Sequence, residues 1–187
     1  MKSLWIKALL MTLLFLMSAG SASAGGPYKG PIFDAMAQFD EKMDMAGNIE
    51  KMKRAGVTKT ALFARSRRYL GHNEAELLEL RQNNPEMIIL GAGKNWFNHT
   101  TDLPPDYIDH TLAAIKKHNY AFVGEILFTH GDKSDGKATG VGEWYIDPLG
   151  SGMTKLLAGL KPLGVPLMTH WEVYAWERDW PKFKKLY

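Results

Sequence analysis

The sequence contains no cysteine among its 187 residues. Small exported domains often depend on disulfides, and this chain has none to form. It must therefore be stabilised by the burial of apolar side chains. A domain of about 160 residues buries roughly 70% of its unfolded surface, which is enough for one hydrophobic core and predicts a single domain.

The chain also lacks an apolar run long enough to cross a membrane. Residues 8–17 are apolar, follow two lysines and precede Ala22-Ser23-Ala24. This three-part pattern predicts a secretory signal peptide over residues 1–24, cleaved after Ala24. Because a spanning helix needs roughly 20 apolar residues, we expect no stable membrane anchor after cleavage. The prediction is a secreted or periplasmic domain over residues 25–187.

A strong excess of charge of one sign is absent as well. The formal net charge of +3 falls to +1 when the two lysines of the leader are removed. We therefore expect no nucleic-acid partner, since binding needs a clear basic footprint. The basic and aromatic tail around Lys182, Lys184 and Lys185 is typical of a solvated helix face, and binding of a partner through it is the weaker alternative.

The sequence does contain a repeated pattern. After residue 30, a short apolar run followed by an amphipathic stretch of helical length recurs five times. Such alternation predicts parallel strands joined by crossover helices, an α/β fold. Two architectures fit. One is an open doubly wound sheet. The other is a TIM-barrel-like fold with about five of its eight units, since a full barrel typically needs about 250 residues.

The expected strands and helices have defined bounds. The strands cover residues 32–38, 60–64, 87–90, 121–128 and 166–171. The helices cover residues 46–55, 74–82, 104–119, 153–163 and 181–187, the fourth being interrupted by Gly159 and Pro162. A glycine-rich loop over residues 131–152 is unusually long for a compact domain, which predicts a lid or a ligand-binding loop.

Polar side chains follow the ends of these strands, where parallel β/α folds gather their chemistry. They are Gln38, Arg65, Lys94, His130, His170 and Glu172. Because alternate residues of a strand point to the same face, two sets are expected to share a cleft. These sets are Asp34, Met36, Gln38 and Asp40 on the first strand, and Met168, His170 and Glu172 on the fifth.

Glu125 lies within the apolar fourth strand. An unpaired buried carboxylate is costly, so Glu125 should have a partner or a raised pKa. It is therefore a candidate acid or base, although a structural ion pair with Arg65 or Lys94 would explain it equally. An arginine such as Arg65 is also the side chain that grips carboxylates or phosphates.

Four segments resemble the metal-dependent amidohydrolases, specifically the amidohydrolase-related barrels. They are residues 31–38 (PIFDAMAQ), 52–57 (MKRAGV), 124–126 (GEI) and 166–172 (PLMTHWE). The resemblance extends over nearly all of the mature chain. It implies a (β/α)8 barrel, shortened here at its C-terminus, with a divalent metal that activates water for hydrolysis.

Family members usually carry a His-x-His metal-binding pair at the end of the first strand, where this chain has Met36 and Gln38. Neither is a good zinc ligand, because a thioether is soft and an amide oxygen is weak. The resemblance assigns the metal ligand of the fifth strand to His170, and zinc is the metal expected.

A catalytic zinc normally needs three protein ligands. His170 and Glu172 supply at most two of them, and the third would come from His130, from Glu125 or from a partner chain. The ligands that the family places on its sixth and eighth strands have no counterpart here.

Two function hypotheses stay open. The first is an exported amidohydrolase-like enzyme that hydrolyses a small anionic substrate. In that case His170 would bind the metal, and Glu125 or Glu172 would move protons. Arg65 or Lys94 would orient the anionic substrate, with Gln38 and His130 as further substrate-binding residues. The second is a non-catalytic remnant or small-molecule binding protein without the metal. In either case the exposed edges of the first and fifth strands predict a homo-oligomer, poor solubility or a partly ordered structure.

Overall fold

The computed structural model describes residues 28–40, 42–65, 73–93, 101–130, 144–172 and 176–186. The chain divides into two units, Met1–Pro31 and Ile32–Tyr187, and the fold described below belongs to the second. The predicted leader lies outside the described residues. Its cleavage and the export of the protein stay predictions, which the N-terminal sequence of the exported protein tests. In the described part of the chain, none of the helices has the length and apolarity required to span a bilayer.

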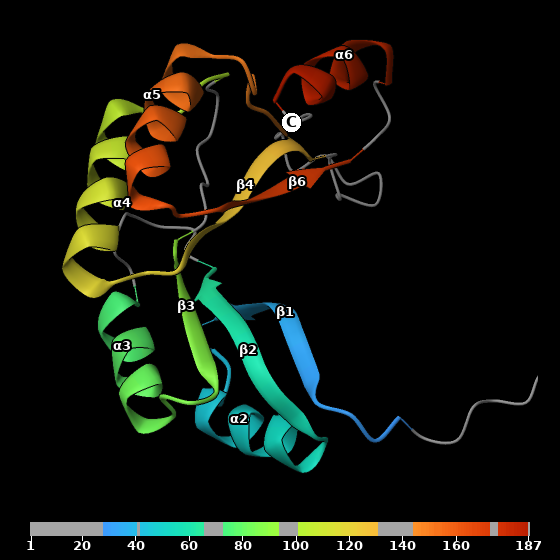
Figure 1. Ribbon diagram of the computed structural model, residues 1–187, viewed down its shortest axis with the longest axis vertical. Coiled ribbons are helices and arrows are strands. Elements are labelled where there is room, and N and C mark those ends of the chain that lie inside the picture. Colours follow the sequence, from blue (N-terminus) through green and yellow to red (C-terminus); the bar gives the residue numbers. More distant parts are fainter. Residues whose placement is uncertain are drawn as a thin grey trace, which may run out of the picture. The chain divides into compact units, whose positions relative to one another are not determined.

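Strands and helices alternate along the second unit (Figure 1). The strands are β1 (Ile32–Phe39), β2 (Val57–Ala64), β3 (Ile88–Ala92), β4 (Phe122–His130), β5 (Trp144–Tyr145) and β6 (Leu167–Trp171). The helices are α2 (Met45–Arg54), α3 (Glu74–Asn83), α4 (Pro105–His118), α5 (Ser151–Leu160) and α6 (Trp176–Leu186), with a 3-10 turn over Lys161–Leu163. The five predicted strands are all present, and β5 is a short addition.

The sheet is built of parallel strands in sequential order. The chain of pairings runs β1, β2, β3, β4 and then β6, while β5 pairs antiparallel with the end of β4. A doubly wound sheet reverses its strand order at a switch point. The observed order has no such reversal, so the doubly wound alternative is wrong and a partial β/α barrel arrangement fits.

One hydrogen bond shows that this sheet is strongly curved. Gln38 Nε2 on β1 donates to Glu125 Oε2 on β4 at 3.2 Å. In a flat sheet, β1 and β4 would lie about 14 Å apart, because two strands separate them and neighbouring strands are about 4.8 Å apart. The contact is possible only because the sheet curls and brings β1 toward β4, as in part of a barrel.

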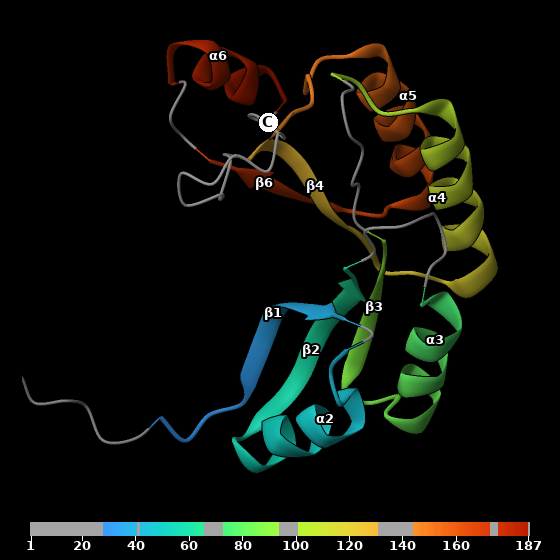
Figure 2. The same ribbon diagram turned by 180° about the vertical axis from the view of Figure 1, so that it is seen from behind.

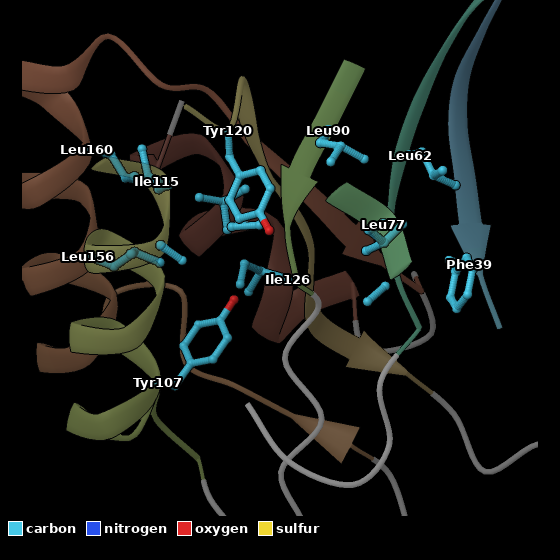
Figure 3. Packing of buried hydrophobic residues seen from close by; sticks show 14 of the residues in the cluster. Phe39, Leu62, Leu77, Leu90, Tyr107, Ile115, Tyr120, Ile126, Leu156 and Leu160 are labelled. Carbon is cyan, nitrogen blue, oxygen red and sulfur yellow. The ribbon is translucent and has the colours of Figure 1, made fainter. Parts of the chain in front are cut away.

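The main hydrophobic core lies between one face of the sheet and the helices α2 to α5. We call this the helix face. Figures 1 and 2 both show α3, α4 and α5 on one side of the strands, with α4 beside α5. Figure 3 shows the packing of this core, to which strands and helices contribute Phe39, Leu62, Leu77, Leu90, Tyr107, Ile115, Ile126, Leu156 and Leu160.

The opposite face, which we call the inner face, carries a second and smaller cluster. It consists of Ala61, Phe63 and Phe122, with Ile89 and Met168 packed against it. The rings of Phe63 and Phe122 meet edge to face with their centroids 6.1 Å apart. The strands are thus apolar on both faces, as is typical of parallel β/α sheets.

A β-bulge in β1 overturns part of the expected face pattern. Asp34 pairs with Thr60 and Gln38 with Phe63, so the register slips between the two pairs. Thr60 and Phe63 point to opposite faces of β2, and a slip of one residue moves a side chain to the other face. Asp34 therefore lies on the helix face, where Thr60 Oγ1 donates to Asp34 Oδ2 at 3.5 Å, and the prediction that it shares a face with Gln38 is wrong.

Two helix predictions also need correction. Gly159 does not interrupt α5, which runs through it to Leu160; a Cβ at Gly159 would lie 2.5 Å from Leu112 Cδ1, so glycine permits the close approach of α4. The last helix begins at Trp176 rather than at Pro181, which lies inside it. Tertiary contacts of the first turn, in which Asp179 is buried, hold that part of the helix in place.

Candidate metal-binding site

Two adjacent parallel strands supply most of the site. β4 carries Glu125 and His130, β6 carries His170, and Glu172 follows β6 directly. The backbone N–H of Glu172 donates to Thr129 O at 3.1 Å, which extends the pairing of the two strands by one residue. This bond fixes Glu172 beside the end of β4, next to His130.

The pairing of β4 with β6 explains how Glu125 and His130 come to face the same site. The two residues are five positions apart, and simple alternation would place them on opposite faces. The register slips between Leu127 and Thr129, where two steps on β4 match one step on β6. The slip inverts the alternation, so His130 joins Glu125 on the inner face.

Three groups that can bind a metal converge at this point. One ligand atom from each of His130, His170 and Glu172 lies within 4.8 Å of the others. His170 Nε2 is 3.2 Å from Glu172 Oε1, and His130 Nε2 is 3.8 Å from the same oxygen. The two imidazole rings stack with their centroids 5.4 Å apart and their planes at 22°. All three side chains are half-buried.

A buried carboxylate lies behind His170. Glu125 is 3% exposed, and its Oε1 lies 2.8 Å from His170 Nδ1. Its Oε2 accepts the hydrogen bond from Gln38 described above. The prediction that Glu125 needs a partner is confirmed, and among the described residues His170 and Gln38 are partners. Of the two predicted ion-pair partners, Lys94 lies outside the described residues. Gln38, Glu125 and His170 thus converge, which agrees with the expectation that Gln38 and His170 share a cleft.

The donor set fits a divalent transition metal. Two imidazoles and one carboxylate are the protein ligands of several catalytic zinc sites and of facial iron(II) sites. Ligand atoms on a tetrahedral zinc with bonds of about 2.1 Å lie about 3.4 Å apart. The distances of 3.2 and 3.8 Å bracket that value. A histidine ligand normally donates its other ring N–H to a carboxylate, which is the relation between His170 and Glu125.

The other predicted site residues lie apart from this cluster or outside the described residues. Arg65 follows β2 with an exposed side chain, and its backbone N–H donates to Phe39 O at 2.8 Å. Met36 on β1 is 52% exposed. Lys94 and the loop residues 131–143, which form most of the predicted lid, lie outside the described residues.

Comparison with known proteins leaves the family open. No family model, no curated protein and no solved structure matches the chain. The resemblance to amidohydrolases therefore stays an expectation drawn from the four sequence segments.

Proposed function

We propose that this protein is a metal-dependent hydrolase of the amidohydrolase type, with a divalent metal held by His130, His170 and Glu172. The observation that carries the proposal is the convergence of their three ligand atoms within 4.8 Å. The buried carboxylate behind His170 adds to it, because such a partner is typical of histidines that bind metals. Zinc is the metal that the donor set and the sequence resemblance favour.

A bound divalent metal would act as a Lewis acid and lower the pKa of coordinated water toward about 7. The side chains of the protein would bind the metal and orient the substrate. His130 and His170 offer neutral nitrogens from adjacent strands, and Glu172 offers a carboxylate that offsets part of the charge of the cation. The side chains are only half-buried, so a substrate can approach from the open side.

The proposed substrate is small and anionic. Arg65 follows β2 at the carboxyl ends of the strands. Its side chain is exposed, so the guanidinium can reach the carboxylate of a substrate. In the sequence, Lys94 comes two residues after the end of β3. Cationic side chains at this edge would favour substrates that carry a carboxylate beside the bond to be cleaved. In this proposal the protein is exported and its leader is removed.

The decisive experiment measures metal binding to the full-length protein. After treatment with a chelator, the protein is reloaded with zinc, manganese or iron(II), and bound metal is counted by mass spectrometry and calorimetry. We expect about one equivalent, and the variants His130→Ala, His170→Ala and Glu172→Ala should lose more than about tenfold in affinity.

The matched controls are His110→Ala on α4 and Glu177→Ala on α6, which remove the same side-chain types outside the site. Both should bind metal like the parent. Less than about a tenth of an equivalent on the parent protein at saturating metal would reject the proposal. A metal-loaded protein is then assayed against small amides and esters that carry a carboxylate, and loss of turnover in the ligand variants is the expected result.

A second candidate function is a small-molecule binding protein without a metal. The observation that favours it lies on β1, which supplies neither of the expected ligands: Met36 is exposed and Gln38 is hydrogen-bonded to Glu125. Metal-free parent protein that binds small carboxylates, with binding lost in Arg65→Ala, would support this alternative.

A further inference from the structure

We infer that Gln38 and Glu125 are positioning residues for His170, acting in series from β1 through β4 to β6. The inference deepens the proposed metal site and rests on it. Gln38 Nε2 donates to Glu125 Oε2 at 3.2 Å, and Glu125 Oε1 lies 2.8 Å from His170 Nδ1. The other ring nitrogen of His170 faces Glu172 at 3.2 Å. The contacts thus form one line that ends among the three metal-binding groups.

Burial assigns Glu125 to positioning instead of proton transfer. The side chain is 3% exposed, and both of its oxygens are engaged by neighbours. A general base must come within hydrogen-bond distance of the proton that it removes from a substrate. Glu125 instead lies behind the imidazole ring of His170, on the side away from Glu172. We therefore assign its effect on the reaction to its contact with His170.

The contact with Glu125 selects the tautomer of His170. An ionised carboxylate accepts hydrogen bonds and donates none, so the neutral ring places its proton on Nδ1. The lone pair is then on Nε2, which is the nitrogen that faces Glu172 and His130. A carboxylate in this position also fixes the orientation of the ring. His170 therefore presents the lone pair of Nε2 to a metal ion already in the metal-free protein.

Gln38 holds the carboxylate in the orientation that this requires. The amide carries no charge at any working pH, and it donates to the oxygen of Glu125 that does not contact His170. A histidine at this position would add a titrating group and compete for the metal. The contact between Gln38 and Glu125 also crosses the concave side of the sheet. The orientation of His170 therefore depends on the curvature of the sheet.

The first test determines the tautomer of His170 in metal-free, full-length protein. Long-range proton–nitrogen NMR at about pH 9, where imidazoles are neutral, reports which ring nitrogen carries the proton. We expect the Nδ1–H form in the parent and in the matched control Gln82→Leu, an exposed glutamine on α3. Glu125→Met should shift the ring to the Nε2–H form, because Glu172 is then the remaining carboxylate acceptor. An unchanged tautomer in Glu125→Met would overturn the inference.

The second test measures the affinity for zinc alone. Glu125→Met should lose about 10- to 100-fold, and Glu125→Gln, which keeps a neutral acceptor, should lose less. Gln38→Leu should lose up to about tenfold, but nothing further in the Glu125→Met background, because Gln38 acts through Glu125. Additive losses in the double variant would show that Gln38 acts by another route and would overturn the series.

The two tests separate the inference from the proposed function. If the parent binds no zinc, the metal proposal fails, while the tautomer experiment still reports on the contact of Glu125 with His170. If the parent binds zinc and Glu125→Met binds equally well, the metal proposal stands and the positioning role fails. Should a variant fail to fold, as judged by circular dichroism, Glu125→Gln provides the milder substitution at the same atom positions.

Discussion

Glu125 brings a carboxylate into a strand whose neighbours are apolar, and its surroundings determine what that charge can do. A buried charge is tolerated when it is paired and hydrogen-bonded. Here the partners are an imidazole from the next strand and an amide from the far side of the curved sheet. The sequence indicated that Glu125 needs a partner, because a carboxylate within an apolar run can be recognised from the sequence. The identity of the partner could not be predicted, since 45 residues separate Glu125 from His170.

Gly159 supports a residue-scale prediction about packing. Alanine in a helix is favoured over glycine by about 1 kcal/mol, but overpacking typically costs about 1–3 kcal/mol. A Cβ at Gly159 would lie 2.5 Å from Leu112 Cδ1 and 3.3 Å from its Cγ, so the whole side chain would have to move. We expect Gly159→Ala to lower the free energy of unfolding by about 1 kcal/mol, measured by urea denaturation.

A double-mutant cycle provides the control. Leu112→Ala removes the atoms that a Cβ at Gly159 would meet, so Gly159→Ala should be neutral or stabilising in that background. If Gly159→Ala stabilises the parent protein, the close approach of α4 and α5 is not the reason for glycine at this position.

At the scale of the elements, the start of α5 shows how a distant residue defines a helix end. Asp102, which precedes α4, accepts hydrogen bonds from Gly152 N–H at 3.0 Å and from Ser151 Oγ at 2.9 Å. The bond from Gly152 satisfies one of the backbone N–H donors that the first turn of a helix leaves without partners, and the bond from Ser151 adds a side-chain contact at the same carboxylate. The helix therefore begins at Ser151, two residues before the predicted start, because its cap lies 50 residues away in the sequence.

The cap predicts a pH-dependent contribution to stability. Burial by itself would raise the pKa of Asp102, but hydrogen bonds from Gly152, Ser151 and Leu103 outweigh it and hold the pKa below its ordinary value. A carboxylate whose pKa is lowered by folding stabilises the protein above the pKa of the unfolded state. That contribution is lost as the pH falls through the pKa of the folded state, below about pH 4.

We therefore expect Asp102→Ala to cost about 1–2 kcal/mol near neutral pH. The difference from the parent should shrink as the pH falls toward about 3. Urea denaturation at several pH values measures it. Glu79→Ala, an exposed carboxylate on α3, is the control and should change stability by less than about 0.5 kcal/mol at any pH. A difference that is constant with pH would mean that the charge of Asp102 does not contribute.

For the whole molecule, the sequential order of the parallel strands leaves β1 at one edge of the curved sheet. In the part of the chain that the structure describes, β1 pairs with β2 on one side only. Phe33 is 56% exposed and Met36 is 52% exposed on this strand. An exposed apolar edge strand is a template for pairing with another strand. The predicted homo-oligomer would use this edge, with a second copy of the chain as the partner.

The corresponding prediction concerns self-association. The parent protein should sediment as a dimer or larger species, and Phe33→Lys should shift it toward the monomer, since a lysine on an edge strand opposes pairing. Met43→Lys is the matched control, because Met43 is 50% exposed but lies outside any strand. Analytical ultracentrifugation over a range of concentrations measures the difference. A monomeric parent, or equal effects of the two substitutions, would contradict edge pairing.

The sequence by itself determined the elements of this protein and the residues that carry charge near strand ends. Apolar periodicity depends on neighbours a few positions apart, so all five strands of the parallel sheet could be predicted from it. It also identified Gln38, His130, His170 and Glu172 as candidates, because polar residues stand out at the ends of apolar strands. Glu125 was a candidate because a carboxylate stands out inside such a strand.

Only the tertiary structure decided which of these residues meet and in what roles. The bulge in β1 moves Asp34 away from Gln38, and the register slip in β4 brings His130 beside His170. Both depend on pairing with another strand, which local periodicity does not encode. The curvature that joins Gln38 to Glu125 is likewise a property of the whole sheet, since it arises from the packing of helices and strands distant in the sequence.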